Sequence, residues 1–398
     1  MPYRWVVFGL AYLAYFSQFS NYLSWNPFIP FAGEIFGFSI QQSANIVAAV
    51  ALGRIICQIP GGLLVDRFTP KQILPLSLAV SALCIFFAGW NGSFYSILLS
   101  QFLIGCSVVV VWPMSIRLMV DWFPETERDF VAGLLNTGNT LSVAFVSALI
   151  PYAYQLQNWR LAFYVLGIIA CITTVAALGV MKPSASQGSV VQPKRPISIA
   201  TIVRLLKDKK FLCGLAIYAG AVSTTWGANA WLVTYLVQGA ALPSATASFM
   251  MAAFGLCGTI SMPVIGLVTK GKTQRRRMVI LSNLLMLIIL LLSLPWIQNE
   301  LMLWCLMVVL GVAAFSFMGP VNMLVTDIVE PTLFGSAMAV MIFTWQITSM
   351  VQSLLIGFIL NNIQAAFSYQ LVFGVIVLGA VIAAGAVHVM NRKDIIEI

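Results

Sequence analysis

One arginine stands in a stretch that is otherwise apolar, and its chemistry is the clearest in the sequence. Arg54 precedes Asp66 by about 12 residues, or roughly 18 Å of helix. If Asp66 ends a membrane-spanning helix, Arg54 lies near mid-membrane, where an arginine costs at least about 2.5 kcal/mol and usually faces a cavity. A guanidinium binds carboxylate or phosphate through two parallel hydrogen bonds. We therefore predict that Arg54 binds an anionic solute; the alternative is a structural arginine satisfied by helix carbonyls or Gln58.

Aromatic and amide side chains recur at helical spacing in several apolar stretches. In the first stretch Tyr15, Gln18, Tyr22 and Asn26 follow one another at intervals of three or four residues, which places them on one side of a helix. The later stretches add Trp112, Ser115, Asn136, Asn139, Trp226, Asn229, Asn322, Trp345 and Gln346. Such a lining suits a small, partly apolar solute that needs a few hydrogen bonds. The alternative is packing between helices, with the amides as interhelical hydrogen bonds.

Groups that transfer protons or bind metals are scarce in these stretches. His388 is the single histidine, the 12 acidic residues fall in loops or at the ends of apolar runs, and the seven cysteines form no CxxC pair. We therefore expect no metal, no cofactor and no catalytic cluster, so the protein is not expected to be an enzyme. Proton-coupled carriers commonly place a carboxylate near their site, so its absence favours facilitated diffusion or exchange over proton symport.

A nucleotide-binding pattern occurs once, out of context. Residues 266–273 match G-x-x-x-x-G-K-[ST], but a P-loop needs a preceding strand and a following helix within a soluble α/β domain. Here an apolar run precedes the pattern, so we expect no ATP binding. The basic residues lie in short gaps between apolar runs, which favours membrane topology over nucleic-acid binding.

The composition shows which elements must position these residues. Of 398 residues 60% are hydrophobic and 8% are charged, against roughly 25% charged in a soluble domain. The mean hydropathy is +0.95. A soluble enzyme, a disordered regulator and a secreted disulfide scaffold are excluded, because each needs more polar residues or another cysteine pattern. A polytopic membrane protein remains.

The apolar runs are long and continuous, which predicts helices of about 20 residues rather than barrel strands of about 10. Pro113 and Gly319-Pro320 predict kinks in the fourth and tenth runs. The twelve predicted spans are 5–30, 41–65, 72–90, 95–119, 130–152, 160–181, 211–237, 246–269, 278–297, 302–326, 335–360 and 369–390.

The basic residues predict the orientation of these spans. With both termini in the cytoplasm, all of the 21 lysines and arginines except Arg54, Arg117 and Arg160 fall in cytoplasmic segments or at their edges. This asymmetry follows the positive-inside rule and requires an even number of spans. It predicts a multi-pass protein of the cell (inner) membrane.

The chain divides into two similar halves. The polar stretch 182–210 predicts a cytoplasmic linker between residues 1–181 and 211–398, with a short amphipathic helix in its last part. Several positions recur after roughly 205 residues, which indicates a duplicated six-helix unit typical of transporters. The paired positions are Gly62 and Gly266, Asp121 and Asp327, and Ala132 and Ala337.

The segment between the second and third spans resembles the signature G-x-L-x-D-R-x-G-R-K of the major facilitator superfamily. The matching residues are Gly62, Leu64, Asp66, Arg67 and Lys71, and the departures are Thr69 and Pro70. The segments Trp122-Phe123-Pro124 with Glu127-Arg128 and Asn158-Trp159-Arg160 are also similar to segments of that family. The resemblance covers the whole chain and implies an all-α fold of two pseudo-symmetric six-helix bundles.

The resemblance also implies a gate at the cytoplasmic helix ends, formed by Gly62, Asp66, Arg67, Asp121 and Arg128. In such a gate Asp66 lies near the start of the eleventh span, Arg67 pairs with Asp121, and Gly62 permits close helix contact. The alternative is that these charges only anchor helix ends at the membrane surface. The spacing of Arg117 and Asp121 predicts a pair within one helix.

Together these features predict a transporter in which the two bundles rock around a central site, a rocker-switch form of alternating access. We expect a small organic anion as substrate, moved by uniport or exchange. The alternatives are a proton-coupled transporter or exporter of neutral or amphipathic solutes and, in another class, a non-transporting sensor or receptor. The expected partners are the solute and the lipid bilayer, with no nucleic acid and no ATP, and we expect a monomer.

Overall fold

The computed structural model describes residues 3–181, 199–269, 273–330, 333–363 and 365–391. Within these ranges the protein is built from helices, with no β-strand. The first half contains α1 (Tyr3–Leu23), η1 (Asn26–Phe31), α2 (Ala32–Phe36), α3 (Ile40–Arg67), α4 (Pro70–Asn91), α5 (Phe94–Val108), α6 (Val111–Trp122), α7 (Glu125–Gln155) and α8 (Arg160–Val180). The second half contains α9 (Ile199–Lys207), α10 (Lys209–Thr234), the π-helix η3 (Tyr235–Gly239), α11 (Ser244–Thr269), α12 (Thr273–Ser293), η4 (Leu294–Trp296), α13 (Glu300–Phe315), α14 (Met318–Ile328), α15 (Phe334–Asn362) and α16 (Ala365–Asn391).

The predicted spans match these helices. In the described ranges, 11 helical segments are long and apolar enough to cross a membrane. The remaining predicted span is α1, whose hydropathy is lowered by polar residues such as Gln18 and Asn21. The chain is therefore a multi-pass, all-α membrane protein, as its composition predicted. Most of the predicted linker, residues 182–198, lies outside the described residues, but its last part forms the expected short helix α9.

Two spans are broken near the prolines that predicted kinks. The break between α5 and α6 includes Val109, four residues before Pro113, and the break between α13 and α14 includes Ser316, four residues before Pro320. A proline has no N–H to donate to the carbonyl four residues earlier, and its ring clashes with that carbonyl. The two breaks therefore have the same cause and occupy equivalent positions in the two halves.

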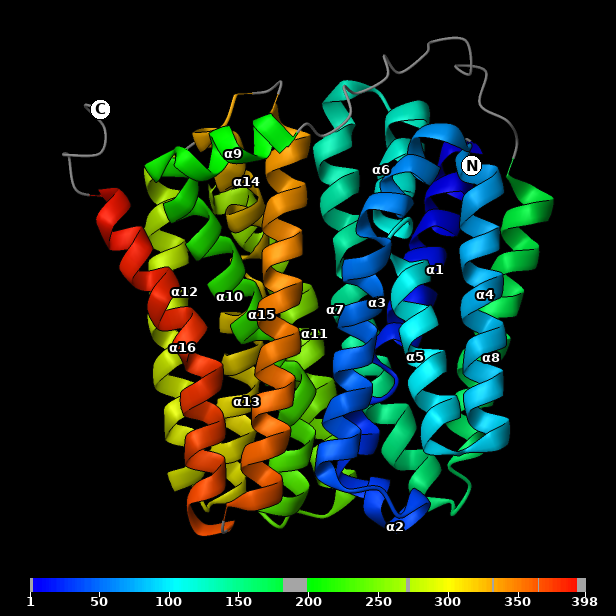
Figure 1. Cartoon of the computed structure of the whole chain (residues 1–398), viewed down its shortest axis with the longest axis vertical. Helices are drawn as coiled ribbons and strands as arrows, with labels where there is room; N and C mark the ends of the chain where they lie inside the picture. The colour runs from blue at the N-terminus through cyan, green and yellow to red at the C-terminus, as the bar shows by residue number, and fades with distance from the viewer. Residues whose placement is uncertain (1–2, 182–198, 270–272, 331–332, 364, 392–398) are drawn as a thin grey trace.

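The helices form two bundles that lie side by side (Figure 1). The helices α1 and α3 to α8 make the first bundle, drawn from blue to green, and α10 to α16 make the second, drawn from green to red. The start of α1 and the end of α16 lie at the same end of the molecule, as an even number of spans requires. We call this the basic end, because Arg4, Lys71, Arg128 and Lys207 lie there; the end with α2 is the far end.

The bundles meet along two helix pairs, α3 with α15 and α7 with α11. Near the far end, a Cβ on Gly357 of α15 would lie 2.3 Å from the Cβ of Ala44 of α3. Midway along the other pair, the hydroxyls of Thr140 and Thr259 are 2.7 Å apart. The bundles are therefore packed together from the far end to the middle.

Toward the basic end the same helix faces are open. Gly62 lies about five turns along α3 from Ala44 and so on the same face, and Gly133 lies about two turns from Thr140 on α7. Both glycines are exposed, and a Cβ at either position would meet no atom within 4 Å. The interface between the bundles therefore separates toward the basic end. The close helix contact expected at Gly62 is absent in this conformation, so its role in a gate stays a prediction.

Candidate functional site

Arg54 lies in the middle of α3 and connects the two bundles. With the side-chain amide of Gln346 turned so that its oxygen faces Arg54, that oxygen accepts hydrogen bonds from Nε at 2.7 Å and Nη1 at 3.0 Å. The guanidinium carbon lies 5.3 Å from the ring centroid of Tyr22 and 5.2 Å from that of Trp345. Both distances are within the range of cation–π attraction. Residues of α1 and α15 thus hold the cation in a defined orientation.

The neighbour of Arg54 fixes the position of α3 in the first bundle. A Cβ on Gly53 would lie 2.1 Å from the carbonyl oxygen of Phe102, and a Cβ on Gly105 would lie 2.1 Å from that of Val50. Only glycine at both positions lets the backbones of α3 and α5 approach this closely. Because Gly53 faces α5, Arg54 points away from α5. Its contacts with Tyr22 and Gln346 show that it faces α1 and the second bundle.

The helix α10 brings further polar and aromatic groups to this region. Tyr218, Trp226 and Asn229 lie on one side of α10, since 11 residues make about three turns. Tyr218 of α10 and Tyr15 of α1 are both buried and close enough to Arg54 to interact with its charge. Tyr218 was not among the predicted residues, although its spacing from Asn229 could have identified it. The site therefore draws on α1, α3, α10 and α15.

A small cavity lies on the far-end side of this cluster. Its volume is about 30 Å³, and it is lined by Tyr22, Leu23, Trp25, Asn26, Val47, Val50, Trp226, Ala230, Ser349 and Ser353. This space suits a water molecule but not a solute of several carbon atoms. The Nδ2 of Asn26 donates to Oδ1 of Asn229 over 3.5 Å, and Nε2 of Gln238 donates to the carbonyl of Pro30 at 2.9 Å. These contacts join the bundles and close the site from the far end.

Gln18, predicted to line the solute pathway, is fully buried inside the first bundle. Its Nε2 donates to the hydroxyl of Ser107 on α5 at 2.6 Å. Asn21 on the same helix likewise donates to Ser81 on α4 at 2.8 Å. We interpret these amides as interhelical hydrogen bonds, the alternative that the sequence left open.

Three other predicted site residues lie on α6, α7 and α14. Trp112 of α6 packs against Tyr15, with ring centroids 5.4 Å apart. Asn136 of α7 and Asn322 of α14 are half-buried, and no hydrogen bond ties either side chain to another described residue. Contact of these two amides with a solute stays a prediction. In the described ranges, no three His, Cys, Asp or Glu side chains gather as a metal site.

At the basic end Arg117 is placed differently from its prediction. Its Nη1 donates to the carbonyls of Val65 and Phe68 at 3.1 and 3.2 Å, so it joins α6 to the end of α3 instead of pairing with Asp121 one turn away. The last carbonyls of a helix lack partners and carry partial negative charge, which attracts a cation. Arg67 is exposed and Asp121 is half-buried; their ion pair stays a prediction. The side chain of Asp66 lies outside the described part of the chain.

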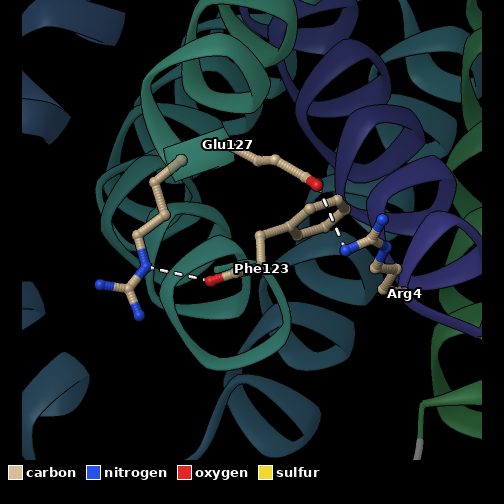
Figure 2. Close-up of polar contacts among 4 residues, drawn as sticks. Arg4, Phe123 and Glu127 are labelled. Atoms are coloured by element: carbon tan, nitrogen blue, oxygen red, sulfur yellow. Dashed lines mark hydrogen bonds and ion pairs between the residues drawn. The ribbon is translucent and has the colours of Figure 1, made fainter. Parts of the chain in front are cut away.

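Arg128, also expected in the gate, donates two hydrogen bonds within the first bundle, and its role in a gate stays a prediction. Its Nε donates to the carbonyl of Phe123 at 3.1 Å and its Nη2 to that of Val120 at 2.9 Å. Figure 2 shows the bond to the carbonyl of Phe123 beside the ion pair of Arg4 with Glu127, whose N–O distance is 3.3 Å. The Arg4 guanidinium also lies 5.6 Å from the ring centroid of Phe123. These contacts tie α1, α6 and α7 together at the basic end.

Comparison with known proteins agrees with this architecture. The family model of the Major Facilitator Superfamily matches residues 11–353 and 248–393. The chain is 23% identical to the D-galactonate transporter of Escherichia coli O6:H1 over 375 residues, which cover 87% of each protein. It is 21% identical to the hexuronate transporter of Escherichia coli K12 over 220 residues, about half of each chain at 52% and 51%.

Among solved structures, the chain is similar to a bacterial homolog of the human lysosomal transporter Spinster in an inward-facing, unoccupied conformation. The TM-score is 0.77 at 16% identity, and the match covers 99% of this chain and 98% of that one. The nucleoside transporter NupG gives a TM-score of 0.76 at 14% identity, covering 98% of this chain and 100% of the other. At these identities the similarity concerns the fold.

Proposed function

The chain belongs to the major facilitator superfamily, and from this premise we propose that it carries a small hydroxylated organic acid across the membrane. Members of this family are transporters that work by alternating access, with one site exposed first on one side and then on the other. In this chain the site lies between two bundles that are packed at the far end and separated at the basic end.

The observation that carries the proposal is the position of Arg54. Its guanidinium lies between the bundles, and the bonds to Gln346 leave most of its N–H donors free. The described groups around it are aromatic rings, amides and hydroxyls, with no carboxylate among them. An unpaired cation in such surroundings is costly, and a bound carboxylate lowers that cost. An organic anion is therefore the solute that this site favours.

The remaining lining supports a hydroxylated carbon chain. The half-buried amides of Asn136 and Asn322, which make no hydrogen bond to another described residue, offer donors and acceptors to hydroxyl groups, and the ring of Trp226 offers an apolar face. A carboxylate at one end with hydroxyls along the chain describes a sugar acid. The names of the two relatives above, a D-galactonate and a hexuronate transporter, belong to this chemical class.

The charge distribution supports the orientation. Lysines and arginines gather at the basic end, which by the positive-inside rule is cytoplasmic, with both chain termini on that side. The structure is then an inward-facing state of an inner-membrane protein. Because the described neighbours of Arg54 include no carboxylate, uniport or exchange accounts for transport without proton coupling. We further propose that the functional unit is a monomer whose moving parts are residues 1–181 and 211–398, joined by 182–210.

Uptake by the purified protein in lipid vesicles tests this function. The vesicles are incubated with radiolabelled glucuronate, galactonate or uncharged glucose, each with and without a pH gradient, and the label retained inside them is measured. We expect uptake of the two acids and not of glucose, and a stimulation when unlabelled acid is trapped inside. A requirement for the pH gradient favours the proton-coupled alternative, and uptake of neutral solutes alone excludes an anion carrier.

The variant Arg54→Ala tests whether Arg54 binds the carboxylate of the transported acid. Removing one member of a buried charge pair costs about 2 kcal/mol or more, so acid uptake is expected to fall about 30-fold or more. Arg160→Gln is the matched control, because it removes an arginine at the far end that stacks on Trp159. Acid uptake by Arg54→Ala at the level of this control contradicts the proposal. Acid binding by the original protein without uptake favours the sensor alternative.

A further inference from the structure

The helix α9 crosses the basic end of the second bundle (Figure 1) and presents two different faces. Leu205 is only 4% exposed and packs into the hydrophobic core of the bundle. Val203 and Leu206, which are three residues apart and so neighbours on the helix surface, are 45% and 42% exposed. The inward face thus anchors the helix, while the outward face leaves apolar side chains uncovered.

Cations flank this apolar face. Arg204 and Lys207 lie on α9, and Lys209 and Lys210 begin α10 immediately afterwards. Among the described residues none of these three lysines takes part in an ion pair. Arg204 approaches Glu330 to 3.9 Å, but both side chains are largely exposed, so this pair contributes little.

The carboxylate of Asp208, next to these lysines, already accepts a hydrogen bond from the backbone. Asp208 lies between the basic residues, and its Oδ1 accepts a hydrogen bond from the backbone N–H of Lys210 at 2.9 Å. It therefore acts as the N-cap of α10, where a carboxylate also interacts favourably with the helix dipole. The lysines keep most of their positive charge available to an external partner.

We propose that α9 and the start of α10, residues 199–210, form a binding surface for anionic phospholipid headgroups. Apolar side chains beside lysines on a helix that crosses the spanning helices near their ends match an interfacial segment, which inserts its apolar residues between lipids and places its cations at phosphate level. Two exposed apolar residues make too small a patch for stable docking of another protein. Charge complementarity and position thus favour the lipid surface as occupant.

Hydrogen exchange of the full-length protein in lipid nanodiscs tests this surface. Deuterium uptake by backbone amides of residues 199–207 is followed as phosphatidylglycerol replaces phosphatidylcholine. We expect slower uptake as the anionic fraction rises, with the change confined to this segment. Equal uptake in both lipids overturns the proposal, and so does equal slowing when free inorganic phosphate is added to phosphatidylcholine discs.

Two double variants that remove the same charge test whether lipid binding depends on residues 199–210 or on the positive charge of the basic end in general. Each lysine near an anionic surface gives roughly a fivefold gain in affinity. The double variant Lys207→Gln/Lys209→Gln is therefore expected to bind the anionic surface about 25-fold more weakly and to lose most of the slowing. The control Lys71→Gln/Arg275→Gln removes the same charge from α4 and α12 and is expected to behave like the original protein. An equal loss in both double variants overturns the assignment to α9.

Discussion

Gly357 of α15 lies so close to Ala44 of α3 that a Cβ on the glycine would be 2.3 Å from the alanine Cβ. A second pair has the same construction, since a Cβ on Gly255 of α11 would be 2.7 Å from the backbone nitrogen of Ala144 of α7. In both pairs the first bundle supplies alanine and the second supplies glycine. Together the two pairs let the bundles pack closely in this conformation.

The variant Gly357→Leu is expected to open the far end. The added side chain cannot fit against Ala44, and overpacking costs about 1–3 kcal/mol, which shifts the ratio of the inward-facing to the outward-facing state by about fivefold or more. Spin labels at Tyr95→Cys and Asn361→Cys, in a cysteine-free background, measure the distance across this end. We expect a longer distance to become populated.

The control for this experiment is Gly374→Leu on α16. A Cβ at Gly374 meets nothing within 4 Å, so the same substitution there is expected to leave the label distances unchanged. Unchanged distances in Gly357→Leu as well contradict the assignment of this contact to closure of the far end.

The variant Gln346→Glu is expected to weaken anion binding without loss of folded protein. A carboxylate at this position accepts the same bonds from Arg54 and neutralises its charge, so the solute carboxylate loses its partner. We expect the dissociation constant for glucuronate, measured by calorimetry in detergent, to rise by at least about tenfold. Gln346→Met removes the acceptor but leaves the cation, and a smaller loss is expected. Equal affinity in Gln346→Glu and the original protein excludes Arg54 as the anion-binding group.

The sequence predicted well those features that depend on local pattern. Run length and charge gave the spans, and Pro113 and Pro320 predicted the two broken helices because a missing N–H acts within one helix. Arg54 was identified because a single cation within an apolar run is energetically costly in a membrane and usually has a function.

Features that depend on contacts between distant segments were less predictable. The spacing of Arg117 and Asp121 predicted a pair within one helix, whereas the structure places the last carbonyls of α3 within reach of Arg117. Gln18 has the same residue type and spacing as the solute-facing candidates, and only the position of Ser107 shows that it faces α5. Likewise, no local pattern indicates that Trp345 and Gln346 of α15 both contact Arg54.

Two glycines of α3 are expected to respond oppositely to alanine. In Gly53→Ala the new methyl group would overlap the carbonyl oxygen of Phe102, 2.1 Å away, so α3 and α5 must separate, at a cost of about 3 kcal/mol. In Gly62→Ala it meets open space, and the better helix propensity of alanine contributes up to about 1 kcal/mol. Thermal unfolding of the purified variants, followed by tryptophan fluorescence, measures the difference. Equal midpoints contradict the close approach of α3 to α5.

The hydroxyl pair of Thr140 and Thr259 is expected to lie at the pivot between the bundles. Thr140 is the middle residue of α7, which spans Glu125–Gln155, and the two hydroxyls are 2.7 Å apart. Toward the far end, Ala144 of α7 packs closely against Gly255 of α11. Toward the basic end, a Cβ on Gly133 of α7 would meet no atom within 4 Å. A bond at the pivot persists in both states, so it contributes to stability but not to the ratio of the states.

A double-mutant cycle checks this expectation. Valine keeps the shape of threonine and removes the hydroxyl, so Thr140→Val, Thr259→Val and the double variant isolate the bond, for which we expect a coupling of about 1 kcal/mol in thermal stability. The spin-label distances used for Gly357→Leu are expected to stay unchanged in all three. A shift of those distances in Thr140→Val shows that the bond breaks during transport and moves the pivot elsewhere. A coupling near zero shows that the hydroxyls do not stabilise the packed bundles.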